Sequence, residues 1–137
     1  LTNELDNKII IDFKSNKPDI LLNSDSEQLS RVFFNLIKNS IESIQDKKID
    51  NVDLIGKIDI SMNENAENIK FIITDNGIGF GIFADNINDI LNPYFTTKKK
   101  GTGLGLSIVN KIINDHNGKI SFVSLKNGAK IEIIFIK

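Results

Sequence analysis

Cysteine is absent from this chain, and tryptophan is absent as well; histidine and methionine occur once each and proline twice. Without cysteine there is no disulfide and no thiolate chemistry, which fits a reducing compartment. The chain also lacks an excess of either charge, since 17 basic and 18 acidic residues leave a net charge of −1. Charge therefore gives no general argument for nucleic acid or an anionic membrane as a partner.

Long hydrophobic runs are missing too. The longest apolar runs, such as residues 131–136, are far shorter than the roughly 20 residues of a spanning helix, so we expect no membrane crossing. The chain begins at Leu1 without a basic-then-apolar signal pattern, and we expect it to be a piece of a longer protein. Its 40% hydrophobic content and 137 residues predict one packed domain over residues 1–137.

Apolar periodicity predicts alternating strands and helices. Strands are expected at residues 8–13, 19–23, 57–62, 69–74, 119–125 and 129–137. Helices are expected from a cap at residues 24–26 to about 45, over 83–91, and from about 104 to Asn117-Gly118, where glycine would take the left-handed conformation. Residues 46–56 and 63–68 are predicted to be loops. The sum is an α/β fold, a two-layer sandwich of a mixed sheet with helices on one face.

The first of four short blocks that carry chemistry is Asn-Leu-Ile-Lys-Asn at residues 35–39. Asn35 and Asn39 are four residues apart on the first long helix, so they share one face. An amide oxygen is a neutral, hard ligand that suits Mg²⁺. Taken alone, however, the block could equally be two solvated or capping asparagines.

The second block, Asp-Asn-Gly-Ile-Gly at residues 75–79, directly follows a predicted strand. A buried carboxylate at Asp75 can accept a hydrogen bond from the exocyclic amine of adenine. Gly77 and Gly79 would let the backbone turn sharply beside the base. The alternative is an ordinary Asx-Gly turn after a strand.

The third and fourth blocks are Asn-Pro-Tyr-Phe-Thr-Thr-Lys at residues 92–98 and Gly-Thr-Gly-Leu-Gly-Leu at 101–106. Glycines at a helix start expose N–H groups that bind phosphate, helped by the helix dipole. The spacing differs from the P-loop and from the dinucleotide fingerprint, and it comes late in the chain. The alternatives are a flexible loop that caps the helix and, for the lysines at 98–100, a solvated charge run.

Together the four blocks resemble the N, G1, F and G2 boxes of the catalytic, ATP-binding domain of sensor histidine kinases. This GHKL superfamily also includes DNA gyrase, heat-shock chaperones and mismatch-repair ATPases. The resemblance runs from about Lys8 to the C-terminus and implies the Bergerat fold. The Ser-Ile-Glu-Ser-Ile run at residues 40–44 and Pro-Tyr-Phe-Thr-Thr-Lys look closest to the nitrogen-regulation type.

The resemblance also implies roles for individual residues. Asn39 would hold Mg²⁺, Asp75 would bind adenine, and Lys98 would contact phosphate, so that Asn39 and Lys98 serve catalysis. Phe95 would anchor the segment between the glycine blocks. The full set expected to bind Mg-ATP is Asn35, Asn39, Asp75, Gly77, Gly79, Phe95, Lys98, Gly101, Thr102, Gly103, Leu104 and Gly105. Glu42 and Ala129-Lys130 depart from the family pattern, which assigns a basic residue and a hydroxyl at these positions.

Kinase activity is favoured over hydrolysis because Asn35 stands where hydrolytic relatives carry a glutamate, and an amide cannot act as a general base. His116, the only histidine, is predicted to end a helix favourably to the dipole rather than to accept phosphate. The acceptor histidine is therefore expected on a separate dimerisation domain, with a response regulator downstream. We expect a cytoplasmic domain of a bacterial, membrane-associated parent, unable to autophosphorylate alone and without a nucleic-acid partner.

Two other functions remain open at this point. One is an anti-sigma-factor-type serine kinase, which would share this pocket and differ in its substrate. The other is a non-catalytic nucleotide-sensing module with a degenerate pocket. A phosphoacceptor histidine in an adjacent dimerisation helix would exclude the first, whereas a failure to bind ATP would favour the second.

Overall fold

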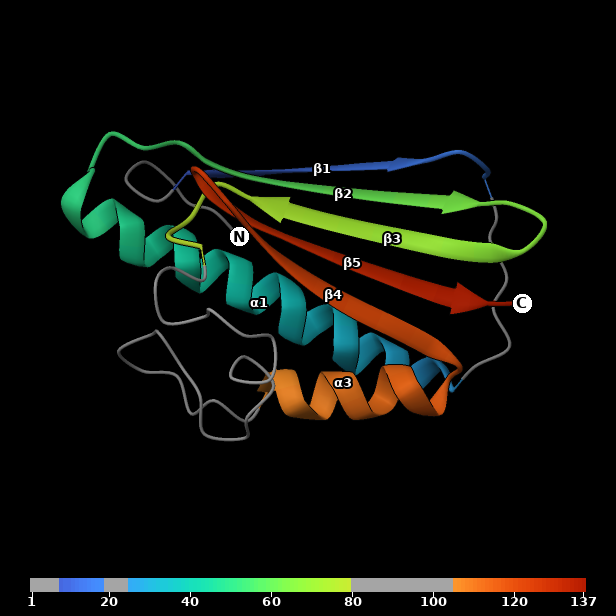
Figure 1. Cartoon of the computed structure of the whole chain (residues 1–137). Helices are drawn as coiled ribbons and strands as arrows, with labels where there is room; N and C mark the ends of the chain where they lie inside the picture. Colours follow the sequence, from blue (N-terminus) through green and yellow to red (C-terminus); the bar gives the residue numbers. More distant parts are fainter. Residues whose placement is uncertain (1–7, 19–24, 80–104) are drawn as a thin grey trace.

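The computed structural model describes residues 8–18, 25–79 and 105–137 (Figure 1). Within these ranges the strands are β1 (Ile9–Ser15), β2 (Gly56–Glu64), β3 (Asn68–Asp75), β4 (Gly118–Leu125) and β5 (Gly128–Ile136). The helices α1 (Ser26–Asp50) and α3 (Gly105–Asp115) lie together on one face of the sheet. This confirms the predicted two-layer mixed-sheet fold. The strand expected at residues 19–23 and the helix at 83–91 lie outside the described residues.

The sheet has the order β1-β2-β3-β5-β4. β1 and β2 are parallel because α1 crosses between them, and the other neighbours are antiparallel. A short turn joins β2 to β3, where the Asn65 side-chain oxygen accepts from the N–H groups of Glu67 and Asn68 at 2.8 and 2.9 Å. The register sets Asp75, the last residue of β3, between Ile58 of β2 and Ala129 of β5.

Alternate residues of the central strands form the core with the apolar faces of both helices. On β3, Ile69, Phe71 and Ile73 are buried, while the residues between them are half-buried. The Phe71 ring lies 4.9 Å from that of Phe33 and 5.8 Å from that of Phe135, centroid to centroid. The other buried core residues are Leu29, Val32, Leu36, Ile44, Ile58, Val109, Ile112, Ile113, Ile120, Ile131 and Ile133.

Helix α1 is longer than predicted: it continues to Asp50, so the loop expected from residue 46 begins only after that residue. The apolar period stops at Ile44, but two lysines hold the last turn through hydrogen bonds to backbone carbonyls. Lys47 Nζ donates to the carbonyl of Asn76 at 3.1 Å, and Lys48 Nζ donates to that of Leu54. Cations also favour a helix C-terminus. Of the described helices, none is long and apolar enough to cross a membrane.

The end of α3 corrects a second prediction. Asn117, not Gly118, adopts the left-handed conformation, with φ of 61°; asparagine is among the few non-glycine residues that tolerate it. Gly118 instead begins β4 and is needed for space. A Cβ there would lie 2.8 Å from Phe135 Cδ1 and 3.0 Å from the carbonyl oxygen of Ile134. The pair thus follows the end of the helix as predicted, but the left-handed residue is Asn117.

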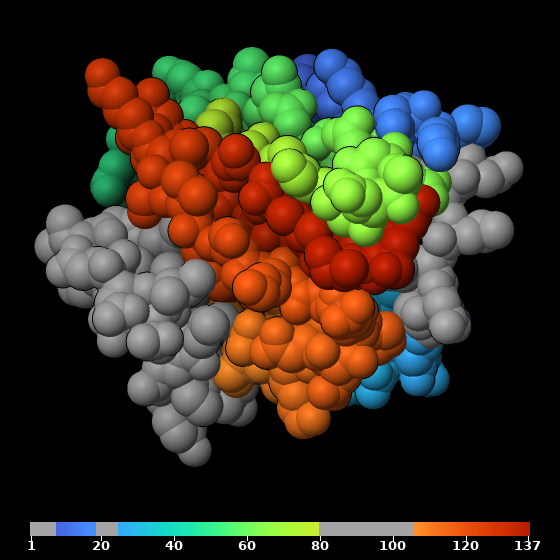
Figure 2. All heavy atoms as spheres, turned by 45° about the vertical axis from the view of Figure 1, so that its right-hand side comes forward, coloured from blue at the N-terminus to red at the C-terminus, as the bar shows by residue number. Residues whose placement is uncertain are grey.

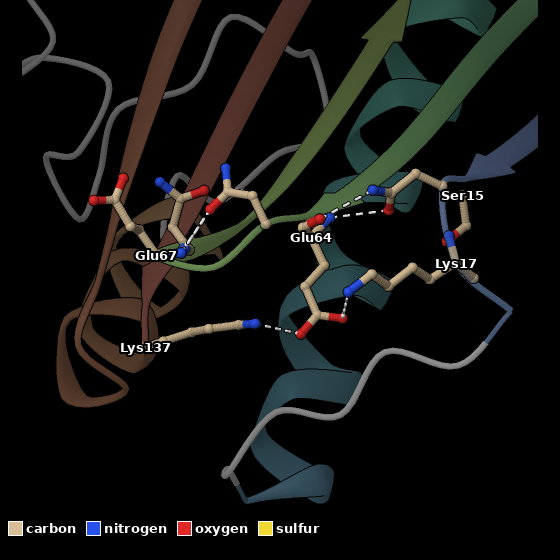
Figure 3. A network of polar contacts seen from close by, with 8 residues as sticks. Ser15, Lys17, Glu64, Glu67 and Lys137 are labelled. Atoms are coloured by element: carbon tan, nitrogen blue, oxygen red, sulfur yellow. Dashed lines mark hydrogen bonds and ion pairs between the residues drawn. The ribbon is translucent and has the colours of Figure 1, made fainter.

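A polar cluster forms at the β2–β3 turn. Lys17 and Lys137 reach Glu64 from opposite sides, at 3.6 and 2.6 Å (Figure 3). The hydrogen bond from Lys137, followed by the charges of both lysines, lowers the pKa of Glu64 from its ordinary value. Figure 2 shows the β2–β3 turn beside the end of β5 on the surface, where Lys137 N–H also donates to the carbonyl of Glu67. The cluster therefore joins three chain segments at this end of the sheet.

Candidate nucleotide-binding site

The structure describes half of the residues predicted to bind nucleotide, and they fall on three elements. Asn35 and Asn39 are on α1, Asp75, Gly77 and Gly79 end β3 or follow it, and Gly105 begins α3. The other predicted residues, Phe95, Lys98, Gly101, Thr102, Gly103 and Leu104, lie outside the described residues. In Figure 1 the segment after β3 descends from the sheet onto α1, and α3 lies beside α1.

One face of α1 carries the polar residues of the site. Asn35, Asn39 and Ser43 are spaced by four, so they lie one above another on this face. Asn35 and Asn39 are half-buried, whereas Ser43 is buried. Glu42 is half-buried on nearly the same face. The helix thus offers amide groups that are neither fully solvated nor part of the apolar core.

The turn after β3 is fastened directly to this face. The N–H of Ile78 donates to Ser43 Oγ at 2.9 Å and lies 3.3 Å from the Ser43 carbonyl oxygen. Asp75, only 8% exposed, accepts from the N–H of Gly77 at 2.9 Å through Oδ1. Because Ser43 lies about one helical turn, roughly 5.4 Å, beyond Asn39, the contact brings the Asp75 turn next to the asparagine pair.

The two glycines of this turn are needed for different reasons. Gly79 has φ of +74°, which glycine adopts without strain, and a Cβ there would lie 2.6 Å from the Gly128 carbonyl oxygen. Gly77 does not have positive φ. A Cβ on Gly77 would lie 2.7 Å from the Ser43 carbonyl carbon and 2.8 Å from Ile44 N. Gly77 therefore permits close approach to α1, and Gly79 supplies the left-handed conformation of the turn.

Several residues that support the site were missed by the sequence reasoning. Ser43 and Lys47 continue the four-residue spacing of Asn35 and Asn39, and both contact the turn after β3. That spacing was the available signal. Gly128 lies against the same turn, since a Cβ there would be 2.8 Å from the Asp75 carbonyl carbon. No sequence signal pointed to Gly128, because the pairing of β5 with β3 had to be known first.

His116 lies directly after α3, at the helix end where the sequence predicted it, and it also makes a contact that was not predicted. Its Nε2 accepts from the N–H of Asp25 at 3.1 Å, and its Nδ1 lies 2.8 Å from the carbonyl oxygen of Ile112. An N–H donor at Nε2 and a carbonyl oxygen at Nδ1 match the tautomer that carries its hydrogen on Nδ1. The Asp25 side chain in turn caps α1 by accepting from the N–H groups of Glu27 and Gln28. His116 thus contacts a carbonyl at the end of α3, as expected of a residue that ends the helix, and also links that end to the start of α1.

The described residues suit a metal ion that arrives bound to a nucleotide better than one held by protein ligands alone. Within the described ranges no three His, Cys, Asp or Glu side chains gather to hold a metal ion. Mg²⁺ commonly keeps several waters and is bound through substrate phosphates with few protein ligands. The amide oxygen of a residue such as Asn39 would be a suitable protein ligand for such an ion. A largely buried acceptor such as Asp75 suits an amine of the base.

Comparison with known proteins places the chain among ATPase domains. The model of the histidine kinase-, DNA gyrase B-, and HSP90-like ATPase family matches residues 24–137. Sporulation kinase A of Bacillus subtilis (strain 168) is 38% identical over 132 residues, which cover 96% of this chain and 20% of that protein. A putative NtrY-like sensor histidine kinase of Rickettsia conorii (strain ATCC VR-613 / Malish 7) is 34% identical over 132 residues, covering 96% and 21%.

Solved structures agree with the sequence comparison. The catalytic domain of histidine kinase ThkA matches with a TM-score of 0.77 and 31% identity, over 94% of this chain and 79% of that one. The chain spans about a fifth of the length of the curated relatives named above. The chain therefore belongs to the family of histidine kinase-, DNA gyrase B-, and HSP90-like ATPases, as an ATP-using domain of the sensor histidine kinase type.

Proposed function

We propose that this chain binds Mg-ATP and donates the γ-phosphoryl group to a histidine on a separate dimerisation domain of its parent protein. The main support is the contact between Ile78 and Ser43. It holds the turn after Asp75 against α1, one helical turn beyond Asn39. This contact supports the proposal because it brings the turn of Asp75, which we assign to the base, toward the face of α1 that carries Asn39, which we assign to the metal.

Adenine recognition is assigned to Asp75. Its carboxylate is largely buried, and an ionised carboxylate only accepts hydrogen bonds. It therefore suits the exocyclic amine of adenine and opposes the carbonyl oxygen that guanine carries at the same ring position. The N–H of Gly77 holds Oδ1 and thereby limits how the carboxylate can rotate.

The phosphates and Mg²⁺ are assigned to α1 and to the start of α3. Asn39 would supply an amide oxygen to the metal, with Asn35 one turn away on the same face. Mg²⁺ would neutralise charge on the phosphates. Helix α3 begins at Gly105, directly after the other glycines of its block, so its first N–H groups suit a phosphate. Lys98 completes the proposed set, because its positive charge would neutralise charge on the phosphates.

The phosphoryl acceptor must come from outside this chain. His116 is the only histidine, and both ring nitrogens have hydrogen-bond partners within the fold. In the transfer, a ring nitrogen of the external histidine forms a bond to the γ-phosphorus. The bond from that phosphorus to the bridging oxygen breaks, and its electrons leave with ADP. Asn35 cannot deprotonate a water molecule, which favours transfer over hydrolysis.

We place the parent protein in two-component signalling, with a response regulator downstream. Histidine kinase ThkA has been solved in complex with the response regulator TrrA, and that kinase matches this chain with a TM-score of 0.72 at 26% identity. The chain would be the cytoplasmic domain of a bacterial, membrane-associated kinase. Its immediate partner would be the parent's own dimerisation domain.

The test is calorimetric titration of the chain with ATP, with and without Mg²⁺, and with GTP as the control nucleotide. We expect selective ATP binding that strengthens with Mg²⁺, and Asp75→Asn should weaken it about 10- to 100-fold, the worth of one hydrogen bond to a charged group. The chain should then phosphorylate a separately supplied dimerisation domain but not itself. Equal binding of ATP and GTP, or undiminished binding by Asp75→Asn, would contradict the assignment of Asp75.

A further inference from the structure

The side chain of Asn76, between the proposed adenine ligand and Gly77, bonds to the backbone at the start of β2. Its Nδ2 donates to the carbonyl of Ile55 at 3.0 Å, and its Oδ1 accepts from the N–H of Lys57 at 2.8 Å. Its own N–H donates to the carbonyl of Lys57 at 3.3 Å. One residue thus makes three hydrogen bonds to a short stretch of a neighbouring strand.

These bonds extend the sheet beyond the last residue of β3. The β2–β3 ladder ends where Asp75 pairs with Ile58. From there the side-chain amide of Asn76 replaces a peptide group, since it offers one acceptor and an N–H donor just as a backbone amide does. The sheet order therefore continues one residue into the turn, although the main chain already leaves the strand direction.

Asn76 is also held from the side of the helix. Lys47 Nζ of α1 donates to the Asn76 carbonyl oxygen at 3.1 Å, and this contact is half-buried. The residues before and after Asn76 make the bond that orients the Asp75 carboxylate, from Gly77 N–H to Oδ1. A residue fixed on two sides between these partners controls where both of them lie.

We propose that Asn76 is a positioning residue that sets the Asp75 carboxylate in the orientation needed for the adenine amine. This inference rests on the proposed role of Asp75 in nucleotide binding. Asn76 would act through the backbone of the turn and would not touch the nucleotide itself. It determines how well the site selects adenine, rather than whether phosphates bind.

The hydrogen-bond pattern explains why an amide is required at this position. Aspartate has the same shape, yet it lacks the N–H that Ile55 receives and would set two oxygens against each other. Alanine would remove both side-chain bonds. Asn76→Asp and Asn76→Ala should therefore both release the turn from β2, and Asn76→Asp does so with almost no change in volume.

The other end of β2 offers a matched control. The side chain of Asn16 also makes two bonds to that strand: Nδ2 donates to the Glu64 carbonyl at 3.0 Å, and Oδ1 accepts from the Glu64 N–H at 2.9 Å. Asn16→Ala therefore removes the same kind of hydrogen-bond pair from the same strand. Glu64 is the last residue of β2, at the end of the sheet away from Asp75 (Figures 1 and 3).

The experiment measures Kd for ATP and for purine riboside triphosphate, which lacks the exocyclic amine, on the wild-type chain and the three variants. Asn76→Ala and Asn76→Asp should weaken ATP binding about tenfold, the effect of one misplaced hydrogen bond, and change binding of the analogue less than about twofold. Asn16→Ala should match Asn76→Ala in urea denaturation and keep the wild-type preference for ATP. A preference for ATP that persists in both Asn76 variants would overturn the inference.

The Asp75→Asn variant distinguishes a failure of the nucleotide assignment from a failure of the positioning role. If it abolishes the preference for ATP over the analogue while the Asn76 variants retain it, the nucleotide assignment stands and the positioning role is wrong. If Asp75→Asn leaves that preference intact, the proposed role of Asp75 is wrong and the inference falls with it. Should Asn76→Ala fail to fold, Asn76→Asp alone decides, because it keeps the bond to Lys57.

Discussion

Replacing Gly77 by alanine tests the contact that brings the two halves of the site together. The added Cβ would lie 2.7 Å from the Ser43 carbonyl carbon and 2.8 Å from Ile44 N. Both are backbone atoms in the middle of α1, which cannot move aside as a flexible side chain could. The turn must therefore withdraw from the helix, and the hydrogen bonds from Ile78 N–H to Ser43 lengthen or break.

The size of the effect follows from these two losses. Overpacking of a tight contact costs about 1–3 kcal/mol, and losing the hydrogen bond to Ser43 costs about 1 kcal/mol more. We therefore expect Gly77→Ala to lower the free energy of unfolding by about 2–4 kcal/mol. Since Gly77 N–H also orients Asp75, the Kd for ATP should rise more than tenfold, or about 1.4 kcal/mol.

Gly118→Ala is the matched control, because its Cβ would meet Phe135 Cδ1 at 2.8 Å and the Ile134 carbonyl oxygen at 3.0 Å. Urea denaturation should show that both variants are destabilised. Calorimetry below the unfolding transition should show weaker ATP binding only for Gly77→Ala. If Gly77→Ala bound ATP as the wild type does, or if Gly118→Ala lost as much affinity, the contact with α1 would not position the adenine ligand.

Two further predictions concern the rest of the fold. His116→Ala removes the bonds to Asp25 N–H and to the Ile112 carbonyl, and should lower the free energy of unfolding by about 1–2 kcal/mol in urea denaturation at pH 7.5; an unchanged midpoint would show that this link contributes nothing. Glu64→Gln should destabilise the chain at pH 7, and the difference from the wild type should disappear on acidification. Because the hydrogen bond from Lys137 lowers the pKa of Glu64, its contribution is complete above the ordinary pKa of 4.5 and is lost as the pH falls through the lowered value. A difference that grew toward acid pH would contradict this sign.

The sequence predicted the layers of the fold well, but it could not determine how the strands pair. Period-two alternation located β2 and β3 to within two residues at each end, because burial on one face imposes that pattern. It said nothing of the parallel pairing of β1 with β2, which depends on where α1 returns the chain. The last turn of α1 was not predicted because it has no apolar period. Lys47 and Lys48 instead donate hydrogen bonds to the carbonyls of Asn76, far along the chain, and of Leu54, just after the helix.

The candidate site divides in the same way. Asn39 and Asp75 were singled out because their side chains have the chemistry that a metal and an adenine need, and their roles stay predictions. The contacts of Ser43 and Asn76 could not be predicted in this way, because both side chains bond to backbone groups whose position only the folded chain defines. Side-chain chemistry therefore suggested candidate residues from the sequence alone, whereas contacts that depend on packing between elements required the folded chain.

The link made by His116 has a mechanical consequence for the helix that begins at Gly105. Helix α3 has 11 residues, and so is about 16 Å long, and its far end is tied to the first residues of α1. A swing of about 10° would carry Gly105 roughly 3 Å, given this helix length. The angle at which His116 holds the far end of α3 therefore helps to set where Gly105 lies.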